Sequence, residues 1–191
     1  MPIHNFFFKY RSFTPIPLVL SILYYSNISY PECMFGGIII AIGEFIRLNA
    51  VRYAGGETRT IKVGAPALCS AGPYARTRNP LYIGNMIIYS GVIIAAAGPH
   101  MWLLLLISFL FFSIQYTLIV QLEESTLYEL FGQPYIDYQN NVPRLFPRFS
   151  SWKNNDNRIP SSIIKTLKTE RRTLQNLAVI ILILLLKSQY L

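Results

Sequence analysis

Two stretches of the chain combine arginine, carboxylate and tyrosine side chains at spacings that could bind a small charged molecule. The first, within residues 64–85, contains Arg76, Arg78 and then Asn79 followed by Pro80. Proline favours the first position of a helix and asparagine the position before it, so we expect a helix to begin here. The free N–H groups of that helix end, together with the two arginines, favour a carboxylate or phosphate. An ordinary capped helix beside topology-setting arginines explains the same residues without a ligand.

The second stretch, residues 119–147, contains the adjacent carboxylates Glu123 and Glu124 at the end of an apolar run. Neighbouring carboxylates at a membrane-embedded helix end repel each other and lose solvation, so a cation or a proton should compensate them. Tyr135 and Tyr138 are three residues apart and therefore share one helix face. A solvated helix end with interfacial aromatic residues is the alternative reading.

A third candidate is the pair Glu44 and Arg47, three residues apart inside an apolar stretch. Charges inside a membrane pair with each other or face a cavity, so this pair is either a substrate-binding site or a structural ion pair. Three glycines in the same stretch predict close helix packing: Gly36, Gly37 and Gly43. No Cys/His spacing typical of a metal motif occurs, so we expect no metal site.

Composition indicates a membrane protein. Of the 191 residues, 52% are hydrophobic and 14% are charged, whereas a soluble domain has about 25% charged residues. This excludes a disordered chain, and two cysteines exclude a disulfide-stapled fold. We expect a single all-α domain over residues 1–191, a polytopic bundle of about five transmembrane helices. They are predicted at residues 14–30, 34–53, 81–98, 101–121 and 173–190; the last is short and could lie in the interface instead.

The positive charge is arranged as a topology signal. Of the 17 basic residues, 2 precede the first span, 6 lie at the end of the second span and in the following loop, and 8 follow the fourth. Loops rich in Lys and Arg stay cytoplasmic, which predicts a cytoplasmic N-terminus and an external C-terminus. No basic nucleic-acid-binding module is present. Residues 150–162 form a polar linker, and an amphipathic segment then leads into the last span.

The motifs of the two stretches, taken in their order along the chain, resemble those of integral-membrane methyltransferases. This group includes isoprenylcysteine carboxyl methyltransferases and phospholipid N-methyltransferases. The similarity covers residues 43–147 and includes Gly72-Pro73-Tyr74, Arg78-Asn79-Pro80-Leu81-Tyr82-Ile83-Gly84, Glu123-Glu124, Phe131-Gly132-Gln133-Pro134-Tyr135-Ile136-Asp137-Tyr138 and Val142-Pro143-Arg144-Leu145-Phe146-Pro147. The stretch from Gly43 to Gly56 is similar to small bacterial members, which implies a bacterial inner membrane.

The resemblance implies a cytoplasmic-face pocket for S-adenosylmethionine. Carried over residue by residue, the family's cofactor contacts fall on Pro66, Ala67, Leu68, Cys69, Tyr74, Asn79, Pro80, Leu81, Tyr82 and Glu123. The charges of the side chains agree with this cofactor, because the Glu123 carboxylate suits its ammonium group and the Arg78 guanidinium suits its carboxylate. A histidine often replaces Asn79 in the family. The isoprenylcysteine enzymes carry a substrate-binding arginine where this chain has Ile119, which argues against a prenylcysteine carboxylate.

We therefore expect a membrane methyltransferase that uses S-adenosylmethionine and acts on a lipid or lipid-like acceptor. Glu124 would take a proton if the acceptor is an amine, and Arg144 is a second catalytic candidate. The substrate candidates are Glu44, Arg47, Tyr135 and Tyr138. The alternatives are an NADPH-dependent membrane reductase of the sterol-reductase type, and a non-catalytic membrane protein whose motifs only set topology. The expected partners are membrane lipids, without nucleic acid or metal.

Overall fold

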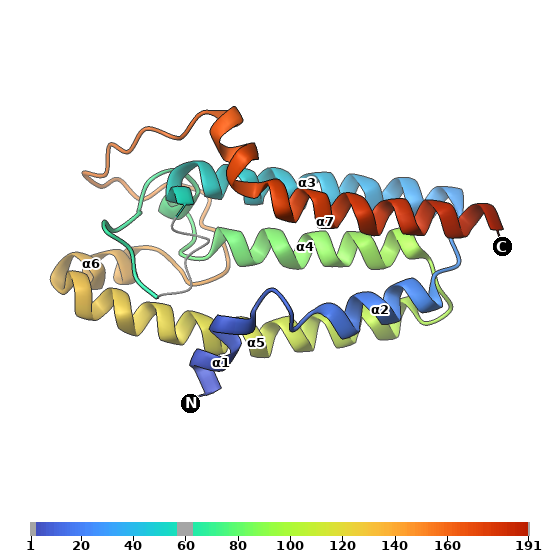
Figure 1. Cartoon of the computed structure of the whole chain (residues 1–191). Helices are drawn as coiled ribbons and strands as arrows, with labels where there is room; N and C mark the ends of the chain where they lie inside the picture. Colours follow the sequence, from blue (N-terminus) through green and yellow to red (C-terminus); the bar gives the residue numbers. More distant parts are fainter. Residues whose placement is uncertain (1–2, 57–62, 191) are drawn as a thin grey trace.

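The longer helices run side by side along one axis, and the polar loops gather at one end of them (Figure 1). A computed structural model describes residues 3–56 and 63–190, except the side chains of residues 189 and 190. The described residues contain helices and no strand. The helices are α1 (Ile3–Tyr10), α2 (Ile16–Tyr25), α3 (Tyr30–Ala54), the 3-10 turn η2 (Gly72–Ala75), α4 (Pro80–Ala96), α5 (Met101–Phe131), α6 (Gln133–Asn141) and α7 (Ile163–Tyr190).

Two of these helices are long and apolar enough to cross a membrane. They are α3 and α5, with mean hydropathies of 1.6 and 2.3, while α2 and α4 are shorter apolar helices beside them. The outer face of α5 exposes large apolar side chains, including Leu103, Leu106 and Phe109. A bilayer covers such a face, whereas water would not. The all-α membrane bundle is thus confirmed; five complete spans remain a prediction.

Glycine contacts bring α3 and α4 close together. A Cβ atom on Gly36 would lie 2.6 Å from the carbonyl oxygen of Gly91, and one on Gly43 would lie 2.9 Å from that of Gly84. Small residues at these positions let the two backbones approach, as predicted. The prediction is wrong for Gly37, where a Cβ atom would meet nothing within 4 Å, because this residue is exposed and does not face α4.

Helix boundaries differ from the sequence prediction at four places. Helix α2 is shorter than the predicted span 14–30 and ends at Tyr25. Helix α3 begins at Tyr30, so Pro31 stands in its first turn, where proline fits well. Helix α5 continues ten residues past 121 and carries both glutamates of the acidic pair. Helix α7 is continuous from Ile163. Polar residues extend α5 and α7 because hydrogen bonding within a helix does not stop where the apolar run ends.

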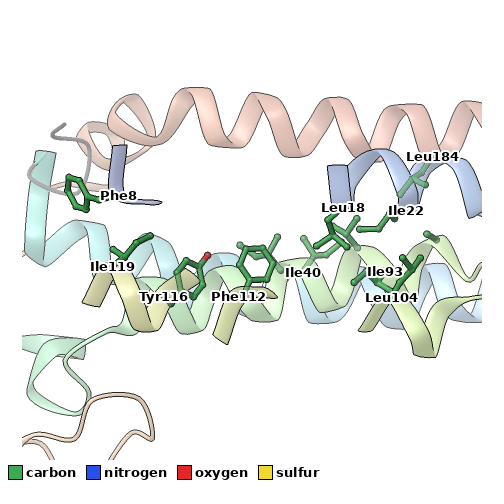
Figure 2. Packing of buried hydrophobic residues seen from close by; sticks show 13 residues of the cluster. Phe8, Leu18, Ile22, Ile40, Ile93, Leu104, Phe112, Tyr116, Ile119 and Leu184 are labelled. Carbon is green, nitrogen blue, oxygen red and sulfur yellow. The ribbon is translucent and has the colours of Figure 1, made fainter. Parts of the chain in front are cut away.

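The apolar core follows the length of the bundle. Figure 2 shows Ile119, Tyr116 and Phe112 of α5 in line toward Leu104, with Ile40 of α3 near the middle. Each of these side chains is at most 8% exposed. Since the core residues come from α1, α2, α3, α4, α5 and α7, the core fixes these helices relative to one another. The basic loop residues Arg59 and Lys62 lie outside the described part of the chain.

Candidate active site

The loop-bearing end of the bundle brings Glu123 of α5 to Tyr82 of α4. The Tyr82 hydroxyl donates a hydrogen bond of 2.8 Å to Oε1 of Glu123. The Tyr82 ring also stacks on Tyr116, with ring centroids 4.4 Å apart. Two cofactor candidates that are 41 positions apart in sequence therefore meet. Tyr116, which the sequence did not single out, holds the tyrosine in place.

Glu124 lies between two arginines. Its Oε1 is 2.9 Å from Nη2 of Arg78, and its Oε2 is 2.5 Å from Nη2 of Arg144. The Arg78 and Glu124 side chains are 9% and 11% exposed, whereas that of Arg144 is 42% exposed. We expected a cation or a proton to compensate the acidic pair. Two guanidinium groups do so for Glu124, whereas Glu123 accepts the hydrogen bond of Tyr82. Because both guanidinium groups engage Glu124, the arrangement favours a carboxylate that orients the arginines over one that accepts a proton.

Helix α6 supplies the two tyrosines that were expected to share a face, and both are buried. The Tyr138 hydroxyl donates to the carbonyl of Tyr74 at 2.9 Å, which ties α6 to η2. The Tyr135 hydroxyl is buried and has no hydrogen-bond partner among the described residues. Burial raises the pKa of Tyr135 to about 12, so this hydroxyl keeps its proton at neutral pH.

Asn79 occupies the position before α4, as expected, but its side chain does not cap the helix. Its amide instead donates to the carbonyl of Arg144 at 3.0 Å. The capping prediction is wrong because the chain after α6 passes close enough to offer that carbonyl. Asn79 thereby joins the start of α4, which includes Pro80 and Leu81, to the segment that carries Arg144.

The predicted cofactor segment 66–69 is contacted by the part of the chain that follows α6. Pro66 and Ala67 are exposed, while Leu68 and Cys69 are half-buried. The Arg158 guanidinium donates to the carbonyl of Leu68 at 3.1 Å. Burial raises the pKa of the Cys69 thiol to about 11, so it stays neutral at neutral pH.

We call residues 148–161 the strap, because this segment follows the loop 68–76 by hydrogen bonds. The sequence predicted a polar linker here; the segment lacks helix but is ordered against the predicted cofactor loop. Its other hydrogen bonds to this loop include Arg148 N to Arg76 O, Trp152 N to Ala75 O, Asn154 Nδ2 to Ser70 O, Ser70 N to Asp156 Oδ2, and Arg76 Nε to Ser151 Oγ.

The pair Glu44 and Arg47 lies between helices. Arg47 is 3% exposed and bonds Glu44 on its own helix as well as Glu170 of α7. A guanidinium held by two carboxylates between α3 and α7 favours the structural ion pair over substrate binding. Glu170 was missed, although it is the only acid among the basic residues at the start of α7. Nothing in the sequence around Asp156 and Arg158, the strap residues that hydrogen-bond to Ser70 and Leu68, indicated that they contact the predicted cofactor loop.

Comparison with known proteins identifies the fold. Residues 31–134 match the sequence model of the phospholipid methyltransferase family, which is more than half of the chain. The chain belongs to this family. A comparison with curated proteins found no match. The family match covers α3 to the start of α6 and therefore includes both acidic residues and the start of α4.

A solved structure supports the same assignment. It is described as the eukaryotic intramembrane Ras methyltransferase ICMT, isoprenylcysteine carboxyl methyltransferase, without a monobody. The two structures superpose with a TM-score of 0.50, and their sequences are 27% identical. The match covers 77% of the chain described here and 50% of the solved chain. The match thus spans half the length of the solved chain. The part of this chain that the structure describes holds no group of three His, Cys, Asp or Glu side chains that could bind a metal.

Proposed function

We propose that the protein transfers a methyl group from S-adenosylmethionine to a lipid or lipid-like acceptor. The observation that carries this proposal is the convergence of the Tyr82–Glu123 hydrogen bond and the Arg78–Glu124–Arg144 cluster at one end of a membrane bundle. These groups come from α4 and the loop before it, from α5 and from the segment after α6, and the chain belongs to a methyltransferase family.

The residues present fit the chemistry of the cofactor. S-Adenosylmethionine carries an ammonium, a sulfonium and a carboxylate, and would supply the methyl group. The Glu123 carboxylate suits the ammonium, and Arg78 with the start of α4 suits the carboxylate. Aromatic faces attract a sulfonium; Tyr74 is a candidate for this contact, while one face of Tyr82 is already covered by Tyr116.

Positioning is the main catalytic contribution that this set of residues can make. Methyl transfer is an in-line displacement, and holding the two reactants about 3–3.5 Å apart supplies much of its rate. Since Glu124 is paired with two arginines, we assign to it the orientation of Arg78 and Arg144. A carboxylate or thiolate acceptor needs no base; an amine acceptor arriving in its neutral form needs none before the methyl transfer.

The acceptor would reach the site from the bilayer. The outward face of α5 is apolar, and its Glu123–Glu124 end adjoins the polar loops. A molecule dissolved in the membrane can therefore place its head group at this end while its chains stay in lipid. From the distribution of basic residues we place this end at the cytoplasmic face, in a multi-pass protein of a bacterial inner membrane.

Cofactor binding tests this function directly. Calorimetry on the full chain in detergent should show binding of S-adenosylmethionine, and Glu123→Ala should reduce the affinity at least tenfold, because it removes the carboxylate for the ammonium. Glu129→Ala, which changes an exposed acid further along α5, is the matched control and should bind normally.

Two outcomes would contradict the proposal. Binding of NADPH without binding of S-adenosylmethionine would favour the membrane reductase. Binding of neither, together with identical lipid mass spectra of cells with and without the protein, would favour a non-catalytic membrane protein. Methyl transfer should instead appear in one lipid class as a difference of about 14 daltons, the mass of one CH₂ group.

A further inference from the structure

Two buried hydrogen-bond donors in the cluster lack an acceptor. They are Nε of Arg78 and the hydroxyl of Tyr135, and neither has a partner among the described residues. Tyr135 is 1% exposed, and the Arg78 side chain is 9% exposed. We call these two groups the donor pair.

Neighbouring residues hold both members of the donor pair in place. Nη1 of Arg78 donates to the carbonyl of Gln139 at 3.0 Å, and its Nη2 is 2.9 Å from Glu124. These contacts prevent the guanidinium from rotating to give Nε another partner. The Tyr135 ring packs edge-on against Tyr138, with centroids 6.2 Å apart. The two donors are therefore fixed in position.

A buried donor without an acceptor destabilises a folded protein, and native structures contain few of them. Both members of the donor pair have a proton to donate, because the arginine Nε is always protonated and the Tyr135 hydroxyl keeps its proton at neutral pH. The positive charge of Arg78 selects an anionic oxygen over a neutral one. Burial has the larger effect on the pKa of the Tyr135 hydroxyl and raises it, while the charge of Arg78 acts on the same hydroxyl and lowers it, so the two donors lie near enough to serve one anionic group.

We propose that Arg78 Nε and the Tyr135 hydroxyl form a subsite for one carboxylate or phosphate oxygen of a ligand. The subsite rests on the proposed function and deepens it, because the oxygen belongs either to the cofactor's carboxylate or to the phosphate of a phospholipid acceptor. The ligand approaches from the side of Arg144, the half-exposed member of the cluster. Its oxygen completes the hydrogen bonding that the protein leaves open.

The variant Tyr135→Phe tests the subsite, because it removes one donor and little volume. Its matched control is Tyr128→Phe, which removes an exposed hydroxyl from the end of α5. The measurements are the thermal unfolding midpoint of the full chain in detergent and calorimetric affinities. The probes are S-adenosylmethionine, its methyl ester and dihexanoylphosphatidylethanolamine, a short-chain phospholipid.

The expected result separates binding from stability. Tyr135→Phe should keep or raise the unfolding midpoint, because the lost hydroxyl had no partner, and should weaken one ligand about tenfold. A loss for S-adenosylmethionine that is absent for its methyl ester assigns the oxygen to the cofactor. A loss for the short-chain phospholipid alone assigns it to the acceptor. The control should change neither the midpoint nor any affinity.

Other outcomes would overturn the subsite. Unchanged affinity for every probe that the wild type binds would exclude the hydroxyl from ligand binding. A clear fall in the unfolding midpoint would show that the hydroxyl has a partner inside the protein. A wild-type protein that binds none of the probes would contradict the proposed function itself, which keeps the two failures distinguishable.

Discussion

At the scale of single residues, the two arginines around Glu124 differ in burial although both contact it. Breaking a buried ion pair from one side costs about 3–5 kcal/mol, whereas an exposed pair contributes about 0–1 kcal/mol. Arg78→Ala should therefore lower the free energy of unfolding by about 3 kcal/mol, and Arg144→Ala by about 1 kcal/mol or less. Denaturant unfolding of the detergent-solubilised protein measures both.

The exposed Arg76, which contacts Ser151 of the strap at 3.2 Å, offers a control for this comparison. Its change to alanine should cost no more than that of Arg144. Equal losses for Arg78 and Arg144 would mean that the two guanidinium groups share Glu124 equally, contrary to their burial. The sequence predicted that a cation or a proton compensates the acidic pair, but spacing could not show which residues do so at Glu124. Arg78 and Arg144 reach Glu124 from 46 and 20 positions away, so only tertiary packing selects them.

At the scale of helices, the spacing between α3 and α4 depends on Gly84. A Cβ atom there would lie 2.9 Å from the carbonyl oxygen of Gly43 and 3.0 Å from the Cβ atom of Arg47. Gly84→Ala should lower the free energy of unfolding by about 1–3 kcal/mol, because backbone must move to make room. It should also weaken cofactor binding, since Tyr82 lies two residues earlier on α4.

The matched control is Gly37→Ala on α3, where the added methyl group meets nothing within 4 Å. There alanine should raise stability by up to about 1 kcal/mol through its helix propensity. Denaturant unfolding of the detergent-solubilised protein, followed by fluorescence, measures the stability of both variants. A neutral effect of Gly84→Ala would show that the helices can separate without loss.

The apolar helices were predictable because their length and composition are local properties of the chain. Their polar continuations were not, as the ten added residues of α5 show. The strap was also out of reach, because its Asn, Ser and Pro residues indicate only a loop. Its order comes from hydrogen bonds to backbone groups about 70 to 110 positions away, and composition carries no record of such partners.

At the scale of the whole molecule, α7 decides the topology. Its charged first turns lie near the site end, where Glu170 meets Arg47 of α3. Its other end reaches α2, where Lys187 Nζ donates to the carbonyls of Leu23, Tyr24 and Ser26 at 2.8–3.1 Å. The C-terminal end of α2 lies at the opposite end of the bundle from α6 (Figure 1). Helix α7 therefore follows the bundle from one end to the other, which argues for a span over an interfacial helix.

Reporter fusions in a bacterial host test this arrangement. Alkaline phosphatase fused after residue 191 should be active, because α7 carries the C-terminus across the membrane while the basic loops stay inside. A fusion after residue 155, within the strap, should be inactive, and green fluorescent protein at the two positions should give the reverse pattern. An inactive phosphatase at both positions would place α7 in the cytoplasmic interface. Lys187 could then not reach the C-terminal end of α2 at the far end of the bundle, so the bundle itself would have to differ from the one described.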